Sequence, residues 1–208
     1  MEYSYKMEQF VVGPIQTNCY MVINETAAEA VIIDPGEEAK RLAEEIRKQD
    51  VRPVAILLTH GHNDHIDGVN GLVEEFPDLK VYISKAEEPM VLDGRLGGFG
   101  DTGYRIHPDY YVEDGETLSL SGLSYRVISS PGHTAGSVCY YLEDQKILFA
   151  GDTLFYESYG RFDLPTGSRT ELAHSLKKLL TELPGEVRVF PGHGGSTTIA
   201  HEKQVEGF

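Results

Sequence analysis

The stretch LLTHGHNDHIDG, residues 57–68, places four side chains of metal-binding type within six positions. Its spacing fits neither of two common zinc patterns, since the chain has no Cys-x-x-Cys pair and the histidines are not four residues apart as in an H-E-x-x-H helix. An ion bound by one loop also takes ligands from other parts of a chain. The four residues are His60, His62, Asp64 and His65.

Three further candidate ligands directly follow segments with the composition of β-strands. VISSPGHTAGS presents His133, ILFAGDT presents Asp152, and VRVFPGHGGS presents His193. Pro-Gly-His occurs twice in this setting, where proline and glycine turn the chain sharply at a rigid strand end. Because strand ends at one edge of a sheet converge on a common site, we expect these residues to join the first four.

The resulting seven imidazole and carboxylate ligands are too many for one tetrahedral ion and suit two. His60 and His62 lie two residues apart on extended chain and therefore point the same way. With His133, they can bind a first ion. Imidazole and carboxylate ligands suit zinc, and also iron or manganese, and the ligand list alone does not choose among them. Zinc is the metal that we expect.

A second divalent ion can be bound by Asp64 and His65, which begin the next helix, together with His193. Asp152 can give one oxygen to each ion. Two ions ~3.5–4 Å apart activate a water and hold the departing oxygen or sulfur. We therefore assign Asp64 and Asp152 to the catalytic residues as well as to the ligands.

The chain alternates between strand and helix patterns, which predicts an α/β protein. No linker divides it, so residues 1–208 are expected to form a single domain of two similar halves, with helices outside and sheets packed inside. VAILLT, residues 54–59, is apolar throughout and predicts a strand buried on both faces. The other expected strands cover residues 9–13, 18–24, 29–36, 80–84, 117–122, 123–130, 137–143, 146–152 and 187–190.

Three helices are expected between these strands. Residues 37–50 carry Ala39, Leu42, Ala43 and Ile46 on one face, which predicts an amphipathic helix. The other two expected helices cover residues 66–76 and 169–183. The glycine-rich stretch 92–110 predicts a long loop.

The composition narrows the classes of partner. The chain has 208 residues, with 18 Lys and Arg against 33 Asp and Glu, so its net charge of -15 argues against binding to a nucleic-acid backbone. No apolar stretch approaches the ~20 residues of a membrane span, and we expect a cytoplasmic protein without a signal peptide. Cys19 and Cys139 lie within apolar strand patterns and predict buried, inert thiols.

The strings THGHNDHIDG, PGHTAGS, FAGDTLF and VFPGHG strongly resemble the metallo-β-lactamase superfamily over nearly the whole chain. This resemblance implies a four-layer αββα sandwich with the metals at one edge between the halves. It also implies the two ligand groups given above, with Asp152 bridging the ions.

Within the superfamily, TNCYMV, IIDPG and AGDTLF resemble the glyoxalase II-like hydrolases, and GRFD and PGHGGSTTIAHEK resemble a short branch of them. The implied activity is hydrolysis of an acyl thioester, such as the S-acylglutathione lactoylglutathione. Longer glyoxalase II enzymes hold glutathione partly through a helical region after the last ligand, whereas this chain ends at Phe208 and has Gly195 where they have a tyrosine. Recognition of glutathione therefore stays open.

The main alternative is a persulfide dioxygenase, since these superfamily members also carry a Gly-Arg-x-Asp string but use one iron and consume oxygen. Metallo-RNases insert a large domain that this chain lacks, and no motif specifically supports a lactamase or lactonase. A metal that only braces the fold is disfavoured, because structural zinc sites are usually rich in cysteine.

Two further residues are predicted to act beside the ligands. Asp34 ends a strand in IIDPG, and a carboxylate in such a position commonly accepts the second ring N–H of a metal-bound histidine. Arg161 lies in the loop after Asp152, where the longer enzymes have a lysine that contacts glutathione, and it is predicted to bind an anionic substrate. For Asp34 the alternative is an ordinary Asp-Pro-Gly turn, and for Arg161 it is a salt bridge to Asp163. The remaining histidines, His107, His174 and His201, are expected not to bind metal.

Overall fold

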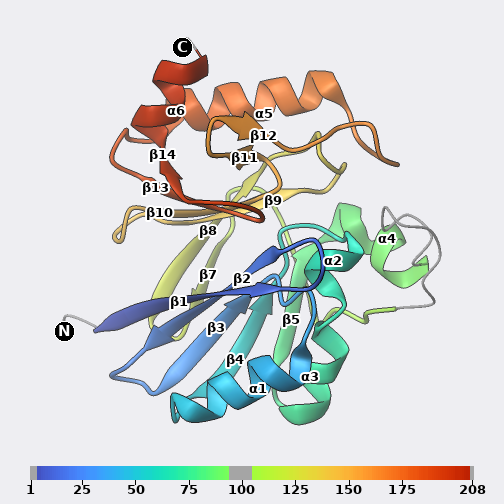
Figure 1. The fold of residues 1–208 in the computed structure, drawn as a ribbon, viewed down its shortest axis with the longest axis vertical. Helices are drawn as coiled ribbons and strands as arrows, with labels where there is room; N and C mark the ends of the chain where they lie inside the picture. Colours follow the sequence, from blue (N-terminus) through green and yellow to red (C-terminus); the bar gives the residue numbers. More distant parts are fainter. Residues whose placement is uncertain (1–3, 94–104, 207–208) are drawn as a thin grey trace.

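The computed structural model describes residues 4–93 and 105–206, and it arranges them in four layers (Figure 1). Two six-stranded sheets lie face to face in the middle, and helices cover the outer face of each sheet. This is the αββα sandwich predicted from the sequence.

The first sheet has the strand order β1-β2-β3-β4-β5-β6. Strands β1, β2 and β3 pair antiparallel, and β3 to β6 pair parallel to one another. Helices α1 (Ala39–Lys48) and α3 (Val69–Glu75) pack on its outer face. The strands are β1 (Tyr5–Val12), β2 (Thr17–Asn24), β3 (Glu29–Ile33), β4 (Arg52–Leu57), β5 (Lys80–Ser84) and β6 (Tyr110–Val112).

The second sheet has the order β14-β13-β10-β9-β8-β7 and carries α5 (Arg169–Glu182) and α6 (Ile199–Glu206) on its outer face. A small hairpin of β11 (Leu154–Phe155) and β12 (Ser158–Tyr159) follows β10. The sheet strands are β7 (Thr117–Leu120), β8 (Leu123–Ser129), β9 (Val138–Leu142), β10 (Ile147–Gly151), β13 (Arg188–Pro191) and β14 (Thr197–Thr198).

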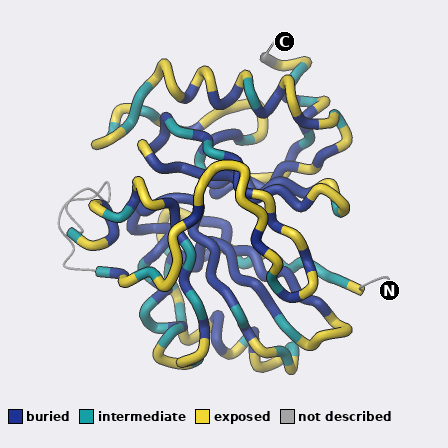
Figure 2. The backbone as a smooth tube through the Cα atoms, turned by 180° about the vertical axis from the view of Figure 1, so that it is seen from behind, coloured by how far each residue is buried: buried dark blue, intermediate teal, exposed yellow. Residues whose placement is uncertain are grey.

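Three apolar layers hold the four layers of the fold together, and the buried chain lies mainly in the two sheets (Figure 2). Strand β2 shows how the sequence builds two of them. Cys19 and Met21 face the helices, whereas Tyr20 and Val22 face the second sheet, as the period of two in a strand requires. Every residue of β2 is buried, so each of its faces contributes to a core.

Several local predictions are confirmed. On α1, Leu42, Ala43 and Ile46 are buried. The strand predicted from VAILLT supplies both faces of its sheet, with Ile56 toward the helices and Leu57 toward the second sheet. Both cysteines are buried and free.

The helix predicted over residues 66–76 is wrong in one respect, because two short helices, α2 (Asn63–Ile66) and α3, stand there. The break falls at Gly68, whose N–H donates to the carbonyl of Pro35 at 2.9 Å. A Cβ at Gly68 would lie 2.5 Å from that carbonyl oxygen, so glycine lets the two turns touch.

Other short elements were not predicted. The 3₁₀ turn η1 (Lys85–Glu87) and α4 (Glu88–Asp93) follow β5, and β6 closes the edge of the first sheet. Most of the loop predicted over residues 92–110 lies outside the described residues. Among the described helices, none is both long enough and apolar enough to cross a membrane.

Candidate metal centre

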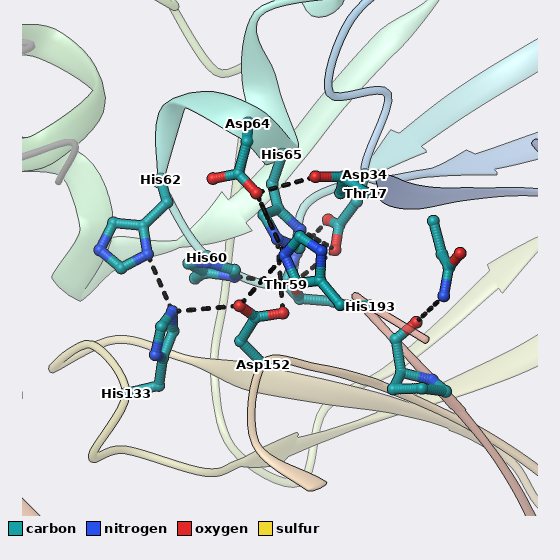
Figure 3. Close-up of polar contacts among 12 residues, drawn as sticks. Thr17, Asp34, Thr59, His60, His62, Asp64, His65, His133, Asp152 and His193 are labelled. Carbon is teal, nitrogen blue, oxygen red and sulfur yellow. Dashed lines mark hydrogen bonds and ion pairs between the residues drawn. The ribbon is translucent and has the colours of Figure 1, made fainter. Parts of the chain in front are cut away.

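All seven predicted ligands lie together at one edge of the sandwich, between its halves (Figure 3). Each of the four segments that carry them leaves a strand just before the ligand, as the sequence predicted. His60 follows β4, His133 follows β8, Asp152 follows β10, and His193 follows β13. The sandwich thus brings ligands from both sheets to one place.

The first group of donors consists of His60, His62 and His133, and all three side chains are buried. One ligand atom from each lies within 4.8 Å of the others. Nδ1 of His62 and Nε2 of His133 are only 2.8 Å apart. Three imidazoles that converge in this way form a nitrogen site suited to a divalent ion.

The second group consists of Asp64, His65 and His193. Oδ2 of Asp64 lies 3.3 Å from Nε2 of His65 and 3.2 Å from Nε2 of His193. Helix α2 presents the first two of these residues, and the loop after β13 presents the third.

Asp152 lies between the two groups. Its Oδ1 is 3.4 Å from Nε2 of His65, and its Oδ2 is 3.5 Å from Nε2 of both His133 and His193. One carboxylate therefore faces imidazoles of both groups, which is the placement that a bridging ligand needs.

The second ring nitrogen of three histidines is held away from the centre. Nδ1 of His133 donates to the backbone carbonyl of Arg161 at 2.7 Å, and Nδ1 of His65 donates to Oδ2 of Asp34 at 2.9 Å. Nδ1 of His60 lies 3.0 Å from the hydroxyl of Thr59. These partners fix the tautomer and leave Nε2 of each ring to a metal.

Asp34 supports two of these rings, that of His65 directly and that of His60 through Thr59. Its Oδ2 accepts from His65 and also from the hydroxyl of Thr59 at 2.6 Å, while its Oδ1 accepts the Thr59 N–H at 2.8 Å. Asp34, His60 and His65 also lie close enough to form a metal site of their own. We instead place Asp34 behind the ligands, because three hydrogen bonds already occupy its two oxygens.

Burial keeps the first group in the metal-binding form. It lowers the pKa of His60 well below its usual value, lowers the pKa of His62 to about 3, and lowers the pKa of His133. These imidazoles are therefore neutral at pH 7. Since a metal ligand must be deprotonated, no proton has to leave them before an ion binds.

The second group is electrostatically different. Burial acts to lower the pKa of His65, but the carboxylates of Asp64 and Asp152 outweigh burial and raise it. For Asp64, burial acts to raise the pKa, yet His65 and the hydrogen bonds from His193 and Thr17 hold it low. In the metal-free chain, this group therefore carries bound protons. An ion that binds there would displace them.

Unpartnered polar atoms support the presence of a metal. Within the described part of the chain, Nε2 of His60, Nε2 of His65 and Oδ1 of Asp152 are buried without a hydrogen-bond partner. Buried polar atoms are rarely left in that state, and the last two of these lie 3.4 Å apart. The donor set and its unmet bonding capacity fit a pair of divalent ions.

Glycines permit the close packing around these ligands. A Cβ at Gly192 would lie 2.1 Å from Oδ1 of Asp152 and 2.6 Å from a ring carbon of His65. A Cβ at Gly36, in IIDPG, would lie 1.6 Å from the backbone oxygen of Asp64. Any other residue at these two positions would push the ligands apart.

The sequence did not reveal several supporting residues. The Thr17 hydroxyl donates to Oδ2 of Asp64 at 2.8 Å, and the Asn18 side chain donates to the carbonyls of Pro191 and Gly194 on either side of His193. The string TNCYMV carried a family resemblance but no ligand chemistry, so only its place at the start of β2 could have indicated this role.

The structure places Arg161 at the surface, with its guanidinium in a two-pronged ion pair with Asp163, at 2.8 and 2.9 Å. This is the contact that the alternative role, a salt bridge to Asp163, requires. Its backbone carbonyl, by contrast, reaches the centre through His133. Of the other histidines, His107 and His174 are exposed, and His201 stacks on Tyr156 away from the ligands.

We expect Asp34→Asn to weaken metal binding by about 10–100-fold, the usual cost of losing such a hydrogen-bond partner. An amide cannot accept all three donors, so His65 loses its orientation. Asparagine tolerates the positive φ of 49° at this position, so the backbone should be preserved. Competition with a chromophoric chelator measures the affinity. Thr59→Val is the companion variant, because it frees His60 but leaves the Asp34–His65 bond, so any loss of affinity that it shows belongs to His60. An unchanged affinity in Asp34→Asn would contradict the assignment.

The sequence profile described as the metallo-beta-lactamase superfamily matches residues 12–193. An uncharacterized protein of Aquifex aeolicus (strain VF5) is 39% identical over 200 residues, covering 95% of this chain and 93% of its own. The probable metallo-hydrolase YqgX of Bacillus subtilis (strain 168) is 33% identical, with 98% and 97% covered. The hydroxyacylglutathione hydrolase GloC of Haemophilus influenzae is 30% identical, with 97% of each chain covered.

Three solved structures are also similar over nearly the whole chain. The B3 metallo-beta-lactamase BLEG-1 is 37% identical with a TM-score of 0.90, covering 96% of this chain and 97% of its own. TTHA1623 in a di-iron-bound form is 36% identical with a TM-score of 0.84, with 95% and 98% covered. ETHE1 from Myxococcus xanthus is 28% identical with a TM-score of 0.78, with 96% and 82% covered.

Proposed function

This chain belongs to the metallo-beta-lactamase superfamily, and from that premise we propose that it is a hydrolase with two divalent metal ions. The observation that carries the proposal is the pair of three-residue ligand groups with Asp152 between them. His60, His62 and His133 would hold one ion, and Asp64, His65 and His193 the other. Asp152 would bridge the two.

When bound, such ions lower the pKa of a water molecule to ~7 and stabilise the negative charge that develops on an acyl oxygen. The chain's own residues prepare for this chemistry. Burial acts to raise the pKa of Asp152, but His65 and the neighbouring imidazoles lower it, so this carboxylate is ionised at neutral pH. Asp64 and Asp152 are therefore the anionic groups that we assign to catalysis.

The substrate class that we propose is an acyl thioester, in particular an S-acylglutathione such as lactoylglutathione. The similarity to GloC over 97% of both chains supports it, together with the glyoxalase II-like strings in the sequence. A thiolate leaves readily, so a hydrolase of this kind needs no strong acid for the departing group. We propose zinc as the metal, while the di-iron form of TTHA1623 makes iron the first alternative.

Two other activities have specific support. The similarity to BLEG-1 favours hydrolysis of a β-lactam, which again requires attack on an acyl carbon. The similarity to ETHE1, with the GRFD string, favours the persulfide dioxygenase alternative. We also propose that residues 1–208 act as one cytoplasmic domain on a small molecule.

Metal analysis combined with three assays tests the proposal. The purified protein is analysed for zinc, iron and manganese and is then given lactoylglutathione under anaerobic conditions, a chromogenic β-lactam, and glutathione persulfide with oxygen uptake recorded. Anaerobic thioester hydrolysis with about two metals per chain supports the proposal. Oxygen uptake with a single iron overturns it, and lactam hydrolysis alone retains the hydrolase but excludes the thioester.

We expect Arg161→Ala to raise KM for an anionic thioester roughly tenfold and to leave kcat nearly unchanged. A charge-assisted contact to a substrate carboxylate is worth ~1.5–3 kcal/mol, and the backbone carbonyl that orients His133 is kept. The ion pair with Asp163 does not prevent such a contact, because both side chains are more than half exposed and exposed pairs contribute only ~0–1 kcal/mol.

Asp163→Ala is the matched control for this prediction. It removes the competing carboxylate and leaves the guanidinium, so KM for the anionic substrate should stay the same or fall. A neutral thioester of similar size should be unaffected in both variants. Equal losses of thermal stability in the two variants, with KM unchanged, would show that the ion pair only stiffens the loop.

A further inference from the structure

Glu87 is a buried carboxylate next to the metal centre that none of the predicted roles uses. It ends the turn η1 after β5 and is only 1% exposed. Acidic side chains are almost never so buried unless they are paired. No cation pairs with it in the described part of the chain, so its position requires another explanation.

Its two oxygens join two loops that carry metal ligands. Oε2 accepts the N–H of Gly61 at 2.8 Å, and Oε1 accepts the N–H of Gly136 at 2.7 Å. Gly61 lies between His60 and His62, and Gly136 lies three residues after His133. One carboxylate therefore connects the two segments that supply the three imidazoles of the first group.

The packing around this carboxylate is tight on both sides. A Cβ at Gly136 would lie 2.6 Å from Oε1 of Glu87, and a Cβ at Gly61 would lie 3.1 Å from Oε2. Met90 and Val91 of α4 close the same space beside Gly61. Glycine at both positions lets the carboxylate reach the backbone, so the connection depends on three residues from separate parts of the chain.

We propose that Glu87 is a positioning residue that sets the separation of the two loops and thereby the geometry of His60, His62 and His133 as ligands of the first ion. The inference rests on the proposed metal centre. A carboxylate with two N–H donors forms charge-assisted hydrogen bonds, which are shorter and stronger than neutral ones. Its removal leaves two buried N–H groups without an acceptor and frees the loops to separate.

Zinc affinity of the otherwise unchanged protein tests this role without any substrate. Glu87→Ala should bind the more tightly held equivalent of zinc about 10–100-fold more weakly, as measured by competition with a chromophoric chelator. The visible spectrum of the cobalt-substituted protein should change as well, because it reports the ligand geometry. Glu87→Gln keeps one acceptor and should give an intermediate affinity.

Asn24→Ala separates positioning from stability. The Asn24 side chain is also fully buried and accepts two backbone N–H groups, from Thr26 and Ala27, but it lies at the end of β2 far from Thr17 and the metal centre. Both alanine variants should lower Tm by several degrees. Only Glu87→Ala should lose zinc affinity.

Gly136→Ala is a second test of this role in case Glu87→Ala does not fold. The new methyl group would press on the carboxylate without removing it, and the same fall in zinc affinity is expected. Zinc affinity within twofold of wild type in folded Glu87→Ala, Glu87→Gln or Gly136→Ala overturns the role of Glu87. A wild-type protein that binds none of zinc, iron(II) and manganese(II) overturns the metal centre, and the inference with it.

Discussion

Replacing Asp152 with alanine is expected to abolish turnover and to reduce the bound metal from about two ions per chain to about one. The carboxylate faces His65 through one oxygen and faces His133 and His193 through the other. Two unit charges ~4 Å apart in a surrounding of effective dielectric ~20 repel by ~4 kcal/mol, and two dications repel by roughly four times as much. Without the anion between them, that repulsion expels one ion.

The loss of turnover should be at least about 10³-fold, since removing a single electrostatic group at a reacting centre already costs about 10²–10³-fold. Elemental analysis after gel filtration gives the occupancy, and steady-state hydrolysis gives the rate. Asp144→Ala makes the same change of charge at an exposed turn residue and should retain both metals and the rate. An Asp152→Ala protein with two ions and a near-normal rate would contradict the bridging role.

The layers of the fold could be predicted because their signal is local. Strand β2 sends alternate residues into two cores, and burial of both its faces is visible in the sequence as the apolar run CYMVI. The clustering of the candidate ligands could be predicted for a related reason. His133 and His193 each follow a Pro-Gly turn at a strand end, and such ends converge wherever strands share a sheet edge.

The supporting contacts could not be predicted, because they join residues far apart in the chain. Thr17 reaches Asp64 across 47 positions, and Glu87 reaches Gly136 across 49. The partner of His133 is a backbone carbonyl, which every residue possesses. The identity of residue 161 therefore gives no indication of this contact. Arg161 itself drew attention for its charge, yet the part of it that touches the centre is its main chain.

Helix α6 could not be predicted from the sequence for a different reason. Its burial rests on Ile199 and on Glu202, whose carboxylate is fully buried and accepts the N–H of Glu157. A helix held by a buried acid shows no clear apolar face, so the periodicity that predicted α1 has little to detect here. The same contact connects α6 to the β11–β12 hairpin, and the hairpin leads into Arg161 and hence to His133.

Removal of the metal ions is expected to eliminate turnover and to lower Tm by roughly 8–16 °C relative to protein in excess zinc. Ions that bind only the folded chain stabilise it by ~4 kcal/mol at a thousandfold excess over Kd. For a chain of this size, 1 kcal/mol corresponds to ~2–4 °C in Tm. In the metal-free state, Nε2 of His60 stays buried without a hydrogen-bond partner among the described residues, and binding of an ion removes that cost.

The metal-free chain should nevertheless remain folded, because three buried apolar layers hold the sandwich together. Circular dichroism after dialysis against dipicolinate should therefore show native secondary structure with a lower Tm. Zinc, iron(II) and manganese(II), each added back under anaerobic conditions, should restore Tm to different extents, and the metal that also restores turnover is the functional one. A chelated protein that keeps its full rate would show that the chemistry does not depend on these ligands. One that unfolds outright would show instead that the metals build the fold, which the burial pattern of the sheets argues against.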